Sequence, residues 1–249
     1  MAIGIMSAMR EEIACLMDQV ETRETIVRGM RTYLRGRLWG KDVVLVFSRW
    51  GKVASATTAT HLINEFKVSE ILFTGVAGAL DPELEIGDVV IGRELYQHDM
   101  DASPLVSPYT VPLLDKSSFA TDPERNRLLR VAADRFLTEK ETHLEPDRLA
   151  SFEITSPKVI EGAIASGDQF ISDSAGIQRI REGLPTVLCA EMEGAAVAQV
   201  CFEYRIPFNI VRTISDKADD NSHIDFPAFA SEIASPYARG IVRNYFDTF

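Results

Sequence analysis

Short apolar runs rich in β-branched residues alternate with segments of helical spacing along most of this chain. Residues 2–9 predict a buried strand, and residues 10–20 continue with apolar side chains three and four positions apart, as in an amphipathic helix. Strand-like runs return at residues 69–80 and 86–99, and the alternation resumes after residue 185. Recurring strands and helices without an internal repeat indicate an α/β fold with a largely parallel or mixed sheet and helices on both faces.

The remaining elements follow from the same patterns. We expect a hairpin turn at Gly40-Lys41 between two short strands, and we expect the run at 69–80 to break at Gly75 and Gly78. The other expected strands lie at 31–39, 42–48, 158–166, 186–190 and 208–215, and the other expected helices at 51–66, 123–136, 174–182, 194–204 and 227–246.

Residues 102–121 interrupt this regularity with three prolines and several serines and threonines, which predicts a long irregular segment. Long loops of this kind are often functional. No linker divides the chain, so we expect residues 1–249 to form one domain, a size that α/β folds commonly reach.

The charge balance favours a small-molecule partner. The chain has 26 Lys and Arg against 37 Asp and Glu, a formal net charge of −11, and its basic residues are scattered among acids. Nucleic acids and anionic membranes favour a clustered basic face, so neither is expected as a partner. An apolar content of 46% excludes a disordered chain.

The three cysteines, Cys15, Cys189 and Cys201, form no C-x-x-C or metal-binding spacing, which suits a reducing compartment. No basic segment precedes the apolar residues 1–9, so a signal peptide is not expected, and no apolar run approaches the ~18 residues of a membrane span. We therefore expect a cytoplasmic protein.

Acids and glycines gather where the expected strands end. In open α/β sheets, ligands bind at the carboxyl ends of strands. These ends carry no phosphate-binding or dinucleotide-binding motif. The pattern predicts a carboxylate-rich pocket for a neutral or cationic ligand. His98, Asp99 and Asp101 lack a second histidine at ligand spacing, so we assign no metal and expect a buried hydrogen-bond cluster there.

Six motifs, in chain order, resemble those of the 5′-methylthioadenosine/S-adenosylhomocysteine nucleosidases. They are AIGIMSAMREEI, TGVAGAL, YQHDMD, SGDQFI, AEMEGAAVAQVC and VRTISDKAD. The resemblance covers most of the chain and is weakest over residues 102–155. It implies a single-domain, three-layer fold with a central twisted mixed sheet flanked by helices, a homodimer, and no cofactor. The implied reaction hydrolyses the N-glycosidic bond of an adenine thionucleoside to adenine and a thioribose.

That reaction requires two carboxyl groups in different surroundings. Adenine is a poor leaving group as an anion, so an acid must protonate it while a base deprotonates the incoming water. The resemblance assigns Asp216 as the acid for purine N7, with Ser215 orienting it, and Glu12 as the base. Glu193 would accept hydrogen bonds from the ribose hydroxyls, because a carboxylate matches a vicinal diol.

The resemblance also implies a set of substrate contacts. Phe170 would stack on adenine and Ile171 would bind its edge through backbone groups, which suits 6-amino over 6-oxo purines. The further residues assigned to the substrate pocket are Met9, Met192, Arg212 and Phe226.

The chain departs from the family pattern at Trp50 and Val76, where smaller or more polar residues are familiar. An apolar wall there favours a methylthio group over a charged homocysteine tail. In the segment at 102–119, Tyr109 and Pro112 are expected to close the thioalkyl pocket of a partner subunit.

Three other functions stay open at this stage. A purine nucleoside phosphorylase shares the architecture but needs a basic phosphate site, and the acids after the first strand would repel phosphate. Nucleosidases acting on futalosine or AMP are possible by analogy of fold. A non-catalytic nucleoside-binding protein is the third alternative.

Overall fold

The computed structural model describes residues 2–217 and 226–249, so Ala218 and Asp219, the last residues of the final motif, lie outside the described parts. Ten strands form one mixed sheet. They are β1 (Ile3–Ser7), β2 (Glu21–Arg28), β3 (Arg31–Leu38), β4 (Lys41–Phe47), β5 (Glu70–Ala79), β6 (Val89–Gln97), β7 (Ser118–Ala120), β8 (Val159–Ser166), β9 (Val187–Glu191) and β10 (Phe208–Asp216).

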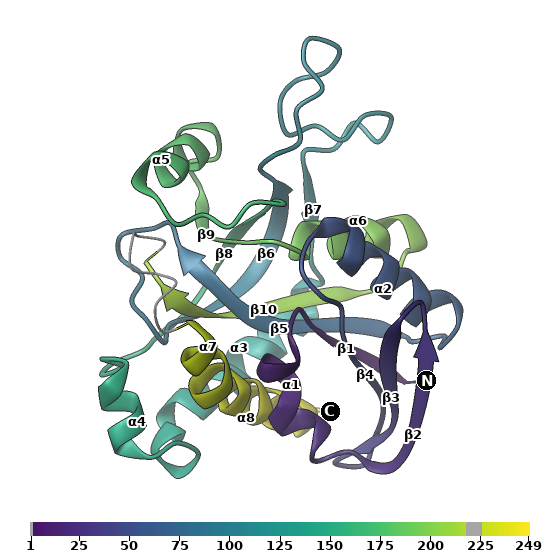
Figure 1. The fold of residues 1–249 in the computed structure, drawn as a ribbon, viewed down its shortest axis with the longest axis vertical. Helices are drawn as coiled ribbons and strands as arrows, with labels where there is room; N and C mark the ends of the chain where they lie inside the picture. Colours follow the sequence, from purple (N-terminus) through teal and green to yellow (C-terminus); the bar gives the residue numbers. More distant parts are fainter. Residues whose placement is uncertain (1, 218–225) are drawn as a thin grey trace.

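The helices cover the two faces of this sheet (Figure 1). Helix α2 packs against α6 on one face, and α8 packs against α1 and α3 on the other. The helices are α1 (Arg10–Met17), α2 (Lys52–Asn64), α3 (Pro123–Thr138), α4 (Pro146–Ser151), α5 (Ser174–Gly183), α6 (Gly194–Tyr204), α7 (Phe226–Phe229) and α8 (Ser235–Phe246). The expected three-layer α/β fold is confirmed.

Part of the sheet closes on itself. The strand order is β10-β6-β8-β9-β5-β1-β4-β3-β2, and β10 also pairs with β5, so β5, β6, β8, β9 and β10 form a closed ring. Strands β1, β4, β3 and β2 extend from it as an open wing.

The centre of the sheet is parallel, with β1 and β10 on either side of β5. Ile5 lies opposite Leu72, and Arg212 lies opposite Gly75. Side chains alternate between the faces, so Ile5 packs in the cluster beneath α1 and α8 while Met6 packs in the cluster beneath α2 and α6. This register brings the carboxyl ends of β1, β5 and β10 to one edge of the sheet.

Several sequence-based expectations need correction. The end of the segment 102–121, predicted to be irregular, forms strand β7, which pairs with β6. Strand β2 was not expected, because its exposed and charged residues show no buried face. Strand β5 passes through Gly75 and Gly78 without a break, and its hydrogen-bonded neighbours keep it extended. The hairpin loop between β3 and β4 is Trp39-Gly40, whose φ angles of +47° and +82° suit such a turn. The expected terminal helix is interrupted by a π-helical segment, Ala230–Ala234.

The proline-rich segment between β6 and β7 lacks regular structure, as expected, and projects from the body of the molecule (Figure 1). Within the residues that the structure describes, no helix is long and apolar enough to cross a membrane.

Candidate active site

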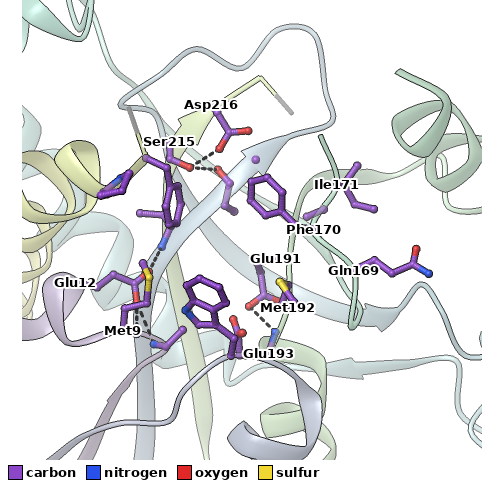
Figure 2. A pocket seen from close by; sticks show the side chains of 18 residues that line it. Met9, Glu12, Gln169, Phe170, Ile171, Glu191, Met192, Glu193, Ser215 and Asp216 are labelled. Atoms are coloured by element: carbon purple, nitrogen blue, oxygen red, sulfur yellow. Dashed lines mark hydrogen bonds between the residues drawn. The ribbon is translucent and has the colours of Figure 1, made fainter. Parts of the chain in front are cut away.

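A cavity of about 540 Å³ lies at the sheet edge where β1, β5, β9 and β10 end (Figure 2). Its wall is largely apolar, and its ionisable groups are all carboxyls. The lining residues are Ala8, Met9, Glu12, Trp50, Val76, Ala77, Gly78, Gln169, Phe170, Ile171, Ala190, Glu191, Met192, Glu193, Ser215, Asp216, Phe226 and Pro227.

Glu12 is fixed at the start of α1 by four hydrogen bonds. Its Oε2 accepts from Ser7 Oγ at 2.6 Å and from the backbone N–H groups of Ala8 and Met9 at 3.0 and 2.9 Å. Its Oε1 accepts from Val76 N–H at 3.0 Å. Burial raises the pKa of Glu12, and these donors oppose that rise in part. Glu12 therefore caps α1 and faces the cavity at the same time.

Gly75 makes room for this carboxylate. A Cβ atom at Gly75 would lie 2.8 Å from Glu12 Oε1, well inside van der Waals contact. The glycine that was expected to end the strand instead lets the strand pass close to Glu12.

Asp216 ends β10 on another side of the cavity and is 7% exposed. Ser215 Oγ donates to its Oδ2 at 2.6 Å, which fixes one oxygen (Figure 2). The cavity thus brings together Glu12, Ser215 and Asp216, as expected from the sequence.

Glu193 follows β9 and is 5% exposed, with its Oε1 accepting from Gly51 N–H at 2.8 Å. Burial raises the pKa of Glu193, and the nearby Glu191 carboxylate raises it further. Met192 lies between these two acids on the cavity wall.

Glu191 and Arg212 form a buried ion pair of 2.7 Å, with side chains 3% and 1% exposed. Glu191 also accepts from Ser166 Oγ and from the N–H groups of Glu193 and Gly194, at 3.2 and 2.9 Å for its Oε2. Arg212 does not line the cavity, so its expected place at the substrate needs correction. Its guanidinium supports the turn that carries Glu193 and lies over the Phe73 ring.

The two expected aromatic residues meet at the cavity. Phe170 and Phe226 have ring centroids 6.3 Å apart in an edge-on arrangement, and Phe170 is 51% exposed. Ile171 follows on the same wall and is buried. This half of the cavity therefore has an apolar wall formed by Phe170, Ile171 and Phe226.

Trp50 and Val76 also line the cavity. Tyr109 and Pro112 do not; Tyr109 packs beside Gly183 at the end of α5, and Pro112 is exposed on the projecting segment.

Sequence reasoning missed several contributors to the site. Ser7 was not singled out because a serine at a strand end has many ordinary roles, although its position five residues before Glu12 was visible. Ala8, Gln169 and Pro227 line the cavity but carry no distinctive chemistry that a sequence pattern could reveal.

The expected cluster at His98, Asp99 and Asp101 is only partly present. Asp99 pairs with Lys52, whereas Asp101 is exposed and accepts from Ser103 N–H. His98 Nε2 is buried and has no hydrogen-bond partner among the described residues. Within the same parts of the chain, no three His, Cys, Asp or Glu side chains are placed to hold a metal ion.

Comparison with known proteins places this chain in a known family. Residues 2–247 match the family model of the Phosphorylase superfamily. A 5′-methylthioadenosine/S-adenosylhomocysteine nucleosidase from Neisseria meningitidis, solved with methylthio-immucillin-A, is 31% identical with a TM-score of 0.85, covering 100% of this chain and 99% of that one. The S-adenosylhomocysteine nucleosidase of Streptococcus pyogenes, solved with 5-methylthiotubericidin, is 31% identical with a TM-score of 0.85, over 100% and 97% of the two chains. Futalosine hydrolase of Helicobacter pylori is 32% identical with a TM-score of 0.84, over 100% and 98%.

The fold and these neighbours define an enzyme that hydrolyses N-glycosidic bonds. The chain belongs to the phosphorylase superfamily.

Proposed function

We propose that this enzyme hydrolyses 5′-methylthioadenosine, S-adenosylhomocysteine, or both, to adenine and the corresponding thioribose. The observation that carries the proposal is the presence of Glu12 and Asp216, two carboxyls with different hydrogen-bond partners, on one largely apolar cavity. The nucleosidases named above support the substrate class.

Glu12 is proposed as the base that activates water. Three donors occupy its Oε2, while its Oε1 accepts from Val76 N–H and retains capacity for a water molecule. The water oxygen bonds to the anomeric carbon as its proton passes to Glu12. Burial assists this step, because a carboxyl of raised pKa is a stronger base.

Asp216 is proposed as the acid. As the glycosidic C–N bond breaks, its electron pair moves into the purine and N7 takes a proton from Asp216. Ser215 donates to Oδ2 of Asp216 and so orients the carboxyl group. Glu12 then holds the proton that came from water, and proton exchange with solvent restores both groups.

Glu193 and Met192 are proposed to hold the ribose. The Glu193 carboxylate would accept from the two ribose hydroxyls, and its negative charge gains value as the sugar becomes cationic in the transition state. The Met192 thioether packs beside it without adding an opposing charge. Met9 lines the same cavity and is proposed as a further substrate contact.

The purine is proposed to stack on Phe170, with Phe226 as a second wall of the base pocket and Ile171 binding the purine edge through its backbone. A 6-amino group and its neighbouring ring nitrogen present a donor and an acceptor in the order opposite to a 6-oxo purine, which favours adenine over hypoxanthine. Trp50 and Val76 are proposed to favour the uncharged methylthio group.

Hydrolysis is favoured over phosphorolysis by the charge of the site. The cavity lining contains Glu12, Glu191, Glu193 and Asp216 and, among the described residues, no Lys or Arg. A phosphate ion would meet repulsion there. Futalosine hydrolysis is the second candidate, and the similarity to the Helicobacter pylori enzyme supports it.

The test is adenine or hypoxanthine release from 5′-methylthioadenosine, S-adenosylhomocysteine, AMP and futalosine, with and without phosphate. We expect adenine release from the two thionucleosides without phosphate, with higher kcat/KM for methylthioadenosine. Equal values would remove the methylthio preference. Strict dependence on phosphate, or activity on futalosine alone, would contradict the proposal.

The acid role has its own test. Asp216→Asn keeps an oxygen that accepts from Ser215 but loses the acidic proton, so kcat should fall by about 100-fold or more. Binding of free adenine, measured by calorimetry, should change little. Full activity of this variant would exclude Asp216 as the acid, whereas adenine binding without turnover in the wild-type protein would favour a binding protein.

We also propose a homodimer in which the projecting segment, with Tyr109 and Pro112, closes the partner's thioalkyl pocket. Leu105 and Leu113 on this segment are 88% and 98% exposed, an apolar surface that an interface would cover. Substrate affinity should weaken as the protein is diluted into monomers, which analytical ultracentrifugation and activity assays would show together. Unchanged affinity in a verified monomer would contradict this arrangement.

A further inference from the structure

The N-terminus of α2 holds acidic side chains from two different loops. Gly51 N–H donates to Glu193 Oε1 at 2.8 Å, and Lys52 N–H donates to Asp168 Oδ1 at 2.7 Å. The first N–H groups of a helix lack partners within the helix and carry its positive dipole end, so they favour carboxylates. One helix end therefore touches both the proposed ribose ligand and the residue that begins the proposed base-binding loop.

The backbone of Asp168 makes a second contact, to the side chain of Asp99. Its N–H donates to Asp99 Oδ2 at 2.8 Å, and the other oxygen of Asp99 accepts from Lys52 Nζ at 2.5 Å. Lys52, Asp99 and Asp168 thus form a closed ring that joins α2, the end of β6 and the loop after β8. Lys52 Nζ also donates to Gln97 Oε1, which anchors the ring to β6.

The ion pair in this ring is partly shielded from solvent. The side chains of Lys52 and Asp99 are 17% and 18% exposed, unlike most ion pairs on the surface of this protein. Burial by itself would raise the pKa of Asp99, but hydrogen bonds from Lys52 and from Asp168 N–H outweigh it and lower that pKa. The two bonds that Asp99 accepts are therefore made to an ionised group, which strengthens them.

The ring contacts a loop that carries part of the proposed base site. Residues 167–173 have no helix or strand, and they carry the half-exposed Phe170. At the far end of the loop, Asp173 caps α5 by accepting from Gly176 N–H at 2.7 Å. The near end is held by Gly167 N–H, which donates to the Glu191 carbonyl at 3.2 Å, and by the contacts of Asp168.

Gly51 lets the start of α2 lie close to both Asp168 and Glu193. Its φ is +91°, and a Cβ atom there would lie 2.9 Å from Asp168 Oδ1. Only glycine allows the backbone to approach Asp168 and Glu193 together in this conformation.

We infer that Lys52 and Asp99 are positioning residues that fix the base-binding loop relative to Glu193, acting through Asp168 and the start of α2. The inference rests on the proposed function, because it takes the loop as the base site and Glu193 as the ribose site. A free base does not reach Glu193, so its binding does not depend on this spacing. A nucleoside spans both sites and does depend on it.

The experiment compares these two ligands in Asp99→Asn and Lys52→Met. Asparagine has one acceptor oxygen, so it cannot serve Lys52 and Asp168 together as the carboxylate does. We expect kcat/KM for methylthioadenosine to fall by about 10- to 100-fold, the usual effect of lost orientation. The Kd of free adenine, measured by calorimetry, should stay within about twofold of wild type, and Lys52→Arg should recover most of the activity.

The matched control is Glu70→Gln. It breaks another partly buried ion pair, Arg125–Glu70 at 2.7 Å, at the first residue of β5. This variant should keep wild-type kcat/KM even if its Tm falls. Hydrogen exchange of residues 167–171 should be faster in Asp99→Asn and Lys52→Met than in the control.

Two results would overturn the inference: equal weakening of adenine and nucleoside, or no weakening of either. If the wild-type enzyme releases no adenine, the proposed function fails by itself. The positioning role is then decided by hydrogen exchange, which needs no substrate, and unchanged exchange at residues 167–171 would exclude it.

Discussion

At the scale of single residues, the two carboxylate oxygens of Glu12 accept different numbers of hydrogen bonds, and this difference matters most for the chemistry. Oε2 receives three donors and Oε1 receives one from the protein, so one oxygen is held while the other can take part in the reaction. The same bonds make Glu12 a helix-capping residue. A conventional structural role and the proposed catalytic role thus coincide in one side chain.

Ser7 should tune the pH dependence of catalysis. The proposed base must be ionised, so activity falls as the pH drops through the pKa of Glu12, which burial has raised. Ser7 donates to the ionised form and lowers that pKa, so Ser7→Ala should move the acidic limb of the kcat/KM profile to higher pH by about one unit.

The control for this shift is Ser231→Ala, which removes an exposed hydroxyl that donates to the backbone carbonyls of Pro227 and Ala228. Its acidic limb should match that of the wild type. An unshifted limb in Ser7→Ala would show that another group sets it.

At the scale of elements, β5 illustrates how packing overrides a local pattern. Glycine weakens an isolated strand, which is why Gly75 and Gly78 predict a break. Here β5 lies between β1 and β10, whose hydrogen bonds keep it extended, and Gly75 is needed for the close approach of Glu12.

Gly75→Ala should therefore impair catalysis more than folding. The added methyl group would collide with Glu12 Oε1, so we expect kcat/KM to fall by about 10-fold or more. Gly40→Ala is the comparison: its Cβ would meet nothing within 4 Å, but its φ of +82° is strained for alanine. This control should lower Tm and leave the kinetics intact, and the opposite pattern would contradict our assignment.

The sequence predicted most elements because their apolar periodicity reflects burial, as in β1 and α1. It did not predict β2, whose stability comes from pairing with β3 rather than from a buried face. The cavity acids were predictable through motifs, whereas Arg212 was misplaced because a sequence does not show that Glu191 lies between it and the cavity.

At the scale of the whole molecule, the cavity gathers buried acids at one edge of the sheet. Burial and repulsion from Glu191 disfavour the ionised form of Glu193. Such groups commonly reduce stability in exchange for function.

Glu193→Gln should make the protein more stable and less active. The folded state binds the Glu193 proton more tightly than the unfolded chain, so wild-type stability declines as the pH rises from about 4.5 through the raised pKa. The variant lacks this decline and retains an acceptor for Gly51 N–H. Its Tm should equal that of the wild type below pH 4.5 and exceed it by a few degrees at neutral and alkaline pH.

Calorimetric scans across this pH range test the prediction. Glu203→Gln, on the exposed face of α6, serves as the control and should show no such divergence. If the Tm advantage of Glu193→Gln over the wild type shrank with rising pH, the direction assigned to the Glu193 pKa shift would be contradicted.

The parallel arrangement of β1, β5 and β10 has a consequence for the order of events during refolding. Glu12 follows the first strand and Asp216 ends the last, so the two groups meet only after both have docked on β5. Helices α2 and α6 can acquire their far-ultraviolet signal before that moment. During refolding, enzymatic turnover should consequently recover later than the helical signal. The time at which activity returns would then report when the final strands dock on the sheet.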